Sequence, residues 1–375
     1  MGRHHETGNR LERALVAVPV LASLLFAAPG QSFAAGEPDY QHTHAIMANA
    51  INDFVRPGYV NFEAAASSLV ENTSSMCREP GEDTLEATRD AFRATVLAWS
   101  HIEIIRFGPV TSANRFERIL FYPDRKGTGL RQVQRLLAGD EAADWQLGDL
   151  QEQSVAIQGL GGIEFALYGT GSGTLTDTAG ASRCHYVELG ARNIEDIAGQ
   201  LSTAWAKEDG IASIWMYPGP QNRVFRDNRE ALSQLIGAMI HGLETVRDIR
   251  LGSITGTASK QGNPMTAIYR RSGLTMQSVA ANLESVKDLF LSSDIGSLLT
   301  EEHGTLAEQV RFEMDQTIRT AEKLQGDPQE LVSQPATSEK LDYLRQAIRF
   351  AIERLNGEFS AASGLAAGFS FGDGD

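Results

Sequence analysis

The sequence predicts an all-α protein that folds as one helical bundle or as a pair of bundles. Apolar residues recur three and four positions apart along most of the chain, which is the spacing of an amphipathic helix. Alternating strand patterns are scarce, and stretches containing glycine, serine or proline separate the helical segments. Because an amphipathic helix buries its apolar stripe against a neighbour, a chain composed of such helices is expected to fold as bundles.

The expected helices follow from this periodicity in chain order. The second one begins with Asp83 and Glu86 at the spacing of a capping box. Connections are expected at 169–182, 207–222, 251–264 and 325–337. The helical patterns cover residues 42–72, 83–107, 129–138, 147–168, 184–206, 227–250, 273–292, 301–324 and 338–360.

The connection at 207–222 is the best candidate for a domain boundary, since glycines and two prolines interrupt the periodicity near the midpoint of the chain. It predicts an N-terminal domain over 35–212 and a C-terminal domain over 213–362. An ordered loop packed between two bundles is the alternative. An acid, an arginine and then a glycine end both 100–108 and 241–252, which suggests a divergent duplication. The tail at 363–375 is expected to be disordered.

The N-terminus has the composition of a secretory signal peptide. Arginines precede the apolar run 14–28, and "SFA" at 32–34 supplies small residues for cleavage near Ala34. No later stretch is long and apolar enough to span a membrane. We therefore expect residues 1–34 to be removed and the mature protein to be soluble and exported.

The net charge limits the kinds of binding partner, and the cysteine content predicts a disulfide. The formal net charge of −15 opposes binding to nucleic acid or to an anionic membrane surface, and favours a cationic ligand. Cys77 and Cys184 are the only cysteines. An even pair in an oxidising compartment predicts a disulfide, with two free buried thiols as the alternative.

Motifs that identify common enzymes are absent, including the H-E-x-x-H of zinc peptidases and the G-x-S-x-G of serine hydrolases. His241 and Glu244 lie three residues apart on one expected helix, but His241 faces away from its apolar stripe, so a solvated histidine is the simpler interpretation. Glu103 and Arg106 share the apolar stripe of Trp99, which indicates either a structural ion pair or a functional site.

A second buried acid is expected in "GLGGIEFALYG" at 159–169. Glu164 shares its helical face with Leu160 and Tyr168, so it should point into the interior or into a cleft. Glycines at 159, 161 and 162 are costly inside a helix. They therefore suggest the close approach of another backbone, or space for a bound group beside the acid.

Four segments together resemble the imelysin-like proteins of the bacterial periplasm, and the likeness is spread over residues 42–360. They are "WSHIEIIRFGP", "SVAIQGLGGIEFALYG", "CHYVELGARNIEDIAGQLSTAW" and "YRRSGLTMQSVAANLESV". The resemblance implies an all-helical protein of two bundle-like domains, a functional cleft between them and a link to iron acquisition. The founding members were described as metallopeptidases.

The best-known motif of that family is G-x-H-x-x-E. Here Gly159 and Glu164 match, while Gly161 occupies the histidine position. Glu164 alone cannot build a site for a divalent metal such as iron or zinc, so Glu103 or His241 would have to supply ligands, or this chain binds no metal in that way. The cleft candidates are Trp99, Glu103, Arg106, Gly108, Pro109, Gly159, Gly161, Glu164, Tyr168, Arg247, Arg271 and Ser272.

Three classes of function follow. The favoured one is a non-enzymatic periplasmic factor in iron or haem acquisition, whose cleft binds a metal, a chelate or an iron-uptake protein. The second is a metallopeptidase of the imelysin type, whose metal centre the sequence does not complete. The third is an exported scaffold in which Glu103, Arg106 and Glu164 form a buried polar network.

Overall fold

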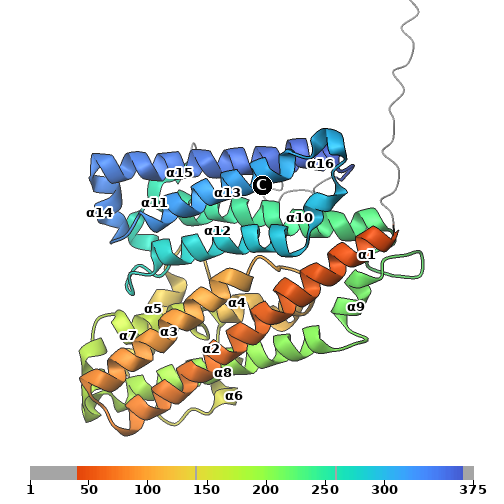
Figure 1. Ribbon diagram of the computed structural model, residues 1–375. Helices are drawn as coiled ribbons and strands as arrows, with labels where there is room; N and C mark the ends of the chain where they lie inside the picture. The colour runs from red at the N-terminus through yellow and green to blue at the C-terminus, as the bar shows by residue number, and fades with distance from the viewer. Residues whose placement is uncertain (1–39, 140–141, 258–259, 366–375) are drawn as a thin grey trace, which may run out of the picture. The chain divides into compact units, whose positions relative to one another are not determined.

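Helices build nearly all of the computed structural model, which describes residues 40–139, 142–257 and 260–365 (Figure 1). Within these residues the only strands are β1 (Gly256–Thr257) and β2 (Lys260–Gln261), which pair antiparallel. The predicted all-α class is therefore confirmed. The expected signal peptide 1–34, its cleavage near Ala34 and residues 366–375 of the expected tail lie outside the described residues.

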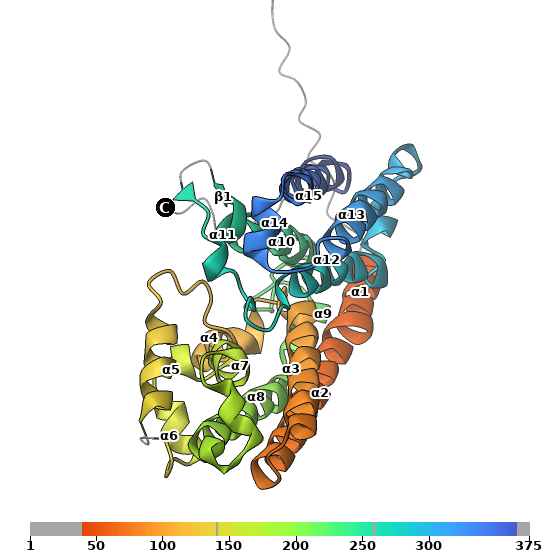
Figure 2. The same cartoon turned by 90° about the vertical axis from the view of Figure 1, so that its left-hand side faces the viewer.

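Three long helices form the core of the N-terminal half. The first, α1 (Tyr40–Asn49), continues through a π-helical segment (Ala50–Val55) into α2 (Arg56–Arg78). Both α3 (Glu82–Ile102) and α8 (Ala181–Ala206) pack along α2 (Figures 1 and 2). Large aromatic side chains fill the space between them, including Phe62, Trp99 and Trp205, all fully buried. These helices form because apolar residues recur on the face that meets the neighbour.

Shorter elements cover one side of these helices. The α-helices are α4 (Arg115–Ile119), α5 (Thr128–Ala138), α6 (Leu147–Glu152), α7 (Leu160–Tyr168) and α9 (Ile211–Met216). 3-10 segments lie at Gly108–Asn114, which is kinked at Ser112 and Ala113, and at Val155–Ile157, Ser172–Thr176 and Thr178–Gly180.

The C-terminal half contains a second group of long helices. Among these, α12 (Thr275–Ser292) packs against α10 (Asn228–Glu244) and α13 (Leu306–Glu322), and α13 packs against α15 (Pro335–Glu353). Two π-helical segments (Thr245–Leu251 and Arg354–Phe359) extend α10 and α15. The shorter elements are α11 (Gly252–Thr255), α14 (Pro328–Ser333), α16 (Ser360–Ala362) and 3-10 turns at Pro264–Thr266, Ile295–Leu298 and Glu301–His303.

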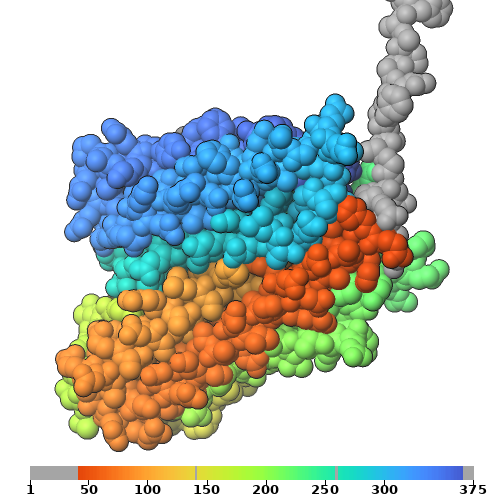
Figure 3. Space-filling model, in the orientation of Figure 1, coloured from red at the N-terminus to blue at the C-terminus, as the bar shows by residue number. Residues whose placement is uncertain are grey.

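The two groups of helices contact each other directly. Helix α12 packs on α3, and α10 packs on α1; Figure 3 shows the surface of α12 and α13 adjoining that of α3. At the expected boundary α9 spans residues 211–216, and its Trp215 is fully buried against Phe107 and Trp205. The division at 212/213 and the duplication remain predictions.

Several expected element boundaries were wrong. The segment 147–168 is not one helix, because the backbone is extended at Gln153 and again at Gly159, which separates α6 from α7. Helix α3 has Gly81 as its N-cap in place of the expected capping box, and it ends at Ile102. Helix α13 starts at Leu306, five residues after the expected position. The connection 325–337 contains α14, which Pro328 initiates at its first position.

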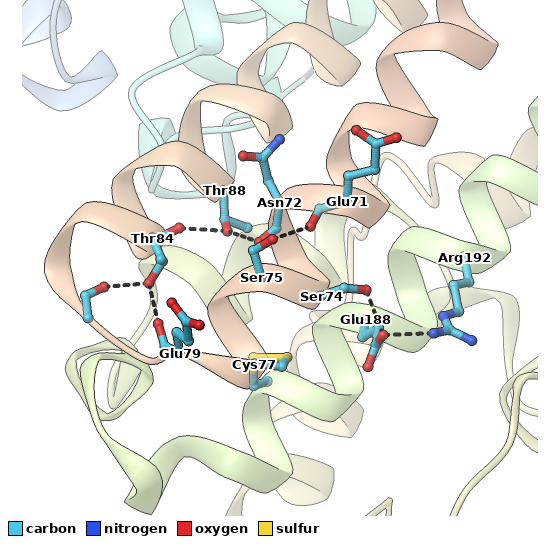
Figure 4. The surroundings of a disulfide bond; sticks show 12 residues. Glu71, Asn72, Ser74, Ser75, Cys77, Glu79, Thr84, Thr88, Glu188 and Arg192 are labelled. Carbon is cyan, nitrogen blue, oxygen red and sulfur yellow. Dashed lines mark hydrogen bonds and ion pairs between the residues drawn. A yellow bond between two sulfur atoms is a disulfide. The ribbon is translucent and has the colours of Figure 1, made fainter.

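The predicted disulfide between Cys77 and Cys184 is present and joins α2 to α8, with the two Cα atoms 5.6 Å apart (Figure 4). A polar contact supports the same junction. Ser74 on α2 donates a 2.8 Å hydrogen bond to Glu188 on α8, and Glu188 also pairs with Arg192 at 2.8 Å. The link therefore holds together two helices that already pack along each other.

None of the helices in the described ranges combines the length and the apolar character needed to cross a membrane.

Candidate functional site

A cavity of about 690 Å³ lies between segments that are distant in the sequence. One wall comes from residues 120–133 and 156–165, and the other from residues 248–271, so both sides of residue 212 contribute. Figure 2 shows α5 and α7 on one side and α11 with β1 on the other. A cavity of this size can enclose a small organic molecule or a metal chelate.

The three glycines at the start of α7 serve different purposes. A Cβ atom at Gly159 would overlap the backbone carbonyls of Arg118 and Ile119, and one at Gly162 would overlap the hydroxyl of Tyr186. A Cβ atom at Gly161 would meet no atom within 4 Å, and this residue lines the cavity. Gly159 and Gly162 therefore allow close packing, and Gly161 leaves open space next to the acid. That a bound group fills this space stays a prediction.

Glu164 lies on the wall of the cavity one helical turn after Gly161 and is only 5% exposed. The backbone N–H and the hydroxyl of Ser272 each donate a 2.9 Å hydrogen bond to its Oε1. Burial raises the pKa of Glu164 above its ordinary value, while Ser272 and the nearby positive charge of Arg271 oppose this shift. The carboxyl group is therefore held in one orientation and has an increased tendency to carry a proton.

The loop from Ile268 to Gly273 forms the wall opposite α7. Tyr269 has a φ of +50°, which is uncommon for a residue with a side chain and shows that the surrounding contacts determine this loop. Arg270 fixes one side of the loop through a 2.9 Å ion pair with Asp327. Arg271 lies 5.2 Å from the centre of the Phe165 ring and also lines the cavity.

Charged side chains on the cavity wall differ in whether they have partners. Asp124 accepts hydrogen bonds from the backbone N–H groups of Thr128 and Leu130 at the start of α5. Asp248 accepts two from the guanidinium of Arg247, at 2.8 and 2.6 Å. In contrast, the guanidinium groups of Arg125 and Arg271 make no hydrogen bond or ion pair with any residue of the described ranges.

A buried ionic network lies behind the cavity wall. Glu103 pairs with Arg250 and accepts a 2.6 Å hydrogen bond from Asn282. An ion pair of Glu103 with Arg106 was one of the two interpretations of the sequence, but Glu103 pairs with Arg250 instead. Helix α3 ends before Glu103, and Arg106 stacks at 4.6 Å over the ring of Phe116, where the charge of Glu103 still acts on it. Tyr269 lines the cavity, and the charges of both Glu103 and Glu164 act on its hydroxyl.

Not every sequence candidate reaches the cavity. Gly161, Glu164 and Arg271 line it, Ser272 bonds to Glu164, and Arg247 contacts the lining residue Asp248. The others lie elsewhere. Trp99 is in the core against Phe62 and Phe116, and Pro109 accepts a hydrogen bond from Arg115. A Cβ atom at Gly108 would lie 3.0 Å from Ile211, and Tyr168 donates a hydrogen bond to the carbonyl of Arg89.

The acidic residues and histidines present do not fit a metal centre at this cavity. Gly161 supplies no ligand, and Oε1 of Glu164 is occupied by Ser272. Glu103 is paired with Arg250, and His241 is 3.0 Å from Glu244 on α10 and does not line the cavity. Across residues 40–139, 142–257 and 260–365 no three His, Cys, Asp or Glu side chains are grouped closely enough to hold an ion. Such a site normally needs three protein ligands.

Sequence reasoning missed several residues of both walls and of the ionic network behind them. Tyr269 belongs to the "YRRSG" stretch that carries the resemblance, and Arg250 follows the helical pattern of 227–250, yet neither was singled out. Asp124 and Arg125 lie in a connection without periodicity, so no signal marked them. Their contribution depends on tertiary contacts across more than 100 residues of chain.

Comparisons with known proteins agree with this architecture. The family model described as imelysin (Peptidase_M75) matches residues 55–355. Iron-regulated protein A of Synechococcus elongatus is 23% identical over 223 residues, covering 58% of this chain and 57% of that protein. The matched region thus spans little more than half the length of that relative.

Two solved structures share the fold. An imelysin-like protein from Psychrobacter arcticum has a TM-score of 0.73 and 18% identity, covering 88% of this chain and 98% of its own. A protein named as an iron-regulated protein A precursor, from Parabacteroides distasonis, has a TM-score of 0.68 and 14% identity, covering 88% and 96%. Since the family model matches most of its length, this chain belongs to the imelysin family.

Proposed function

We propose that this protein is a non-enzymatic periplasmic binding factor in iron or haem acquisition, and that it holds iron within a small chelate or as haem in the cavity beside Glu164. The observation that carries the proposal is the open space of about 690 Å³ next to Gly161 and a buried, oriented carboxyl group. Two relatives are named as iron-regulated proteins, which supports the choice of iron among possible cargoes.

A chelate suits this cavity better than a bare ion. The carboxylates on the wall already accept hydrogen bonds from protein donors, and Gly161 contributes no ligand. A bare divalent ion needs several protein ligands that converge on one point. A chelate or a haem brings most of its ligands with it, so the protein has only to match its shape and its outer polar groups.

The proposed location rests on two features. Residues 1–34 have the composition of a cleaved secretory signal, and the disulfide between Cys77 and Cys184 suits an oxidising compartment. A periplasmic protein of this kind would meet imported iron before it crosses the inner membrane.

The test fills the cavity without disturbing the fold. Gly161→Leu places a side chain in the open space, and Gly148→Leu is its matched control, because both glycines are the second residue of a helix and a Cβ atom at either would meet nothing within 4 Å. Gly148 does not line the cavity. Exported protein without a His tag would be titrated calorimetrically with ferric citrate and with haemin. We expect Gly161→Leu to weaken binding at least tenfold, and Gly148→Leu to leave it unchanged.

Three results would overturn the proposal. Equal affinity in wild type and Gly161→Leu would place the ligand elsewhere. Zinc-dependent, chelator-sensitive cleavage of an unstructured protein substrate, lost in Glu164→Ala, would instead support a metallopeptidase. A deletion strain that grows normally in iron-limited medium, together with no binding of either probe, would leave the scaffold as the function.

A further inference from the structure

Two arginines on the cavity wall make no hydrogen bond or ion pair through their guanidinium groups within the described residues, although the whole chain is acidic. The guanidinium of one of them, Arg271, acts on Glu164 through its charge alone. The carboxylates of Asp124 and Asp248 each accept two hydrogen bonds from other groups of the protein. The carboxyl group of Glu164 accepts two from Ser272. The guanidinium groups of Arg125 and Arg271 have no such partners in the ranges that the structure describes. An arginine stays protonated at any physiological pH, so these two positive charges are permanent.

Arg271 is the better placed of the two to anchor a ligand. It is half-buried, whereas Arg125 lies at the exposed rim. Its position over the ring of Phe165 is a favourable cation–π contact that restrains the side chain while leaving its N–H groups available. A planar guanidinium with several donors matches a carboxylate, which can accept two parallel hydrogen bonds.

The start of α7 adds to this positive character. Gly161 and Gly162, in its first turn, line the cavity, and no side chain caps the helix at Gly159. The backbone N–H groups at a helix N-terminus carry a partial positive charge. Because residue 161 has no side chain, a ligand can approach this turn closely.

From these contacts we infer that the cavity recognises carboxylate groups, with Arg271 as the anchoring cation and Arg125 as a second contact at the rim. The inference rests on the proposed function and specifies its ligand as a carboxylate-bearing iron compound. The carboxylates can belong to an iron chelate of a polycarboxylic acid or to the propionates of haem, since both offer the same recognition chemistry.

Glu164 is compatible with an anionic ligand. Ser272 contacts it, and Arg271, Tyr168 and Tyr269 are close enough to interact with it electrostatically; none of these groups is negatively charged at neutral pH. Because burial favours its neutral form, a carboxylate that binds nearby would increase its tendency to take up a proton. The protonated group can then donate a hydrogen bond to the ligand.

The experiment compares charges on the probe and on the protein. The full exported chain would be titrated with ferric citrate, haemin, iron-free citrate and the neutral complex ferric acetohydroxamate. Arg271→Gln should weaken the binding of ferric citrate or haemin at least tenfold. Arg271→Lys should restore part of the lost affinity, and Arg125→Gln should weaken binding by a smaller factor. Arg311→Gln, on the exposed face of α13 and outside the cavity, is the control and should change nothing.

The titrations test the recognition of carboxylates separately from the proposed role in iron acquisition. Equal binding of the neutral complex, or unchanged affinity in Arg271→Gln, would overturn the recognition of carboxylates while leaving an iron-binding role intact. Binding of iron-free citrate that is sensitive to Arg271→Gln, without binding of ferric citrate or haemin, would support carboxylate recognition and overturn the role in iron acquisition. Failure of every probe to bind would overturn both. A preference for haemin over ferric citrate would identify the propionates as the source.

Discussion

Replacing each of the neighbouring glycines of α7 by alanine should change stability in opposite directions. At Gly161 a Cβ atom meets open space, so Gly161→Ala should raise the free energy of unfolding by about 0.5–1 kcal/mol, the usual gain when a helical glycine becomes alanine. At Gly162 the same atom overlaps the hydroxyl of Tyr186, which is fully buried and donates a 2.7 Å hydrogen bond to the carbonyl of Ile157.

The cost at Gly162 has two parts. Overpacking a filled interior costs about 1–3 kcal/mol, and leaving the buried carbonyl of Ile157 without its donor costs about 1–3 kcal/mol more. We therefore expect Gly162→Ala to lower the free energy of unfolding by about 3 kcal/mol, so the two variants should differ by about 4 kcal/mol. Gly159→Ala should also be strongly destabilising, because the overlapping atoms belong to the backbone near Ile119.

Urea unfolding followed by tryptophan fluorescence would measure these differences, with Gly148→Ala as the control that should match Gly161→Ala. If Gly161→Ala were as destabilising as Gly162→Ala, the space beside Glu164 would be filled in solution, and the reasoning that places a ligand there would fail.

Three further outcomes are expected. Replacing Cys77 and Cys184 together by alanine should lower the free energy of unfolding by about 5 kcal/mol in the chain-entropy estimate, since the closed loop spans 107 residues; urea midpoints equal to those of wild type would contradict this. Glu103→Gln should lower the free energy of unfolding by about 3–5 kcal/mol, because it leaves the buried Arg250 without its charged partner. Asp90→Asn breaks an exposed pair and should lower it by less than about 1 kcal/mol. Similar losses of stability in the two variants in urea unfolding would contradict the role of burial. Because burial raises the pKa of Glu164, the folded state binds this proton more tightly than the unfolded chain. The contribution of Glu164 to stability should therefore fall as pH rises from 4.5 through the folded-state pKa, and Glu164→Gln should lack this dependence; parallel stability curves for the two proteins would refute it.

The fold class was predictable because helical periodicity is a local property, and the predicted disulfide was correct because only one pairing of Cys77 and Cys184 exists. Helix ends were less predictable. The break at Gly159 depends on the backbone of residues 118 and 119, which a local pattern does not reveal.

Within the site, the sequence pointed to Gly161, Glu164, Arg271 and Ser272, and the structure brings these residues together. The partner of Glu103 could not be found in the same way. Arg250 is 147 residues away, while Arg106 had the spacing of a partner on a continuing helix. Because the helix ends at Ile102, Glu103 does not pair with Arg106 and pairs with the distant Arg250 instead.

The cavity wall is built from distant parts of the chain, so ligand binding should protect the folded protein from proteolysis. Residues 120–133 and 248–271 must both be in place before a ligand can be enclosed, so an unfolded or half-folded chain has no comparable affinity. A ligand present at 100 times its dissociation constant would then add about 2.7 kcal/mol to stability. Proteases that cleave transiently opened molecules would find about a hundredfold fewer of them. The loaded protein should outlast the empty one, so its abundance would rise with the supply of the ligand it carries.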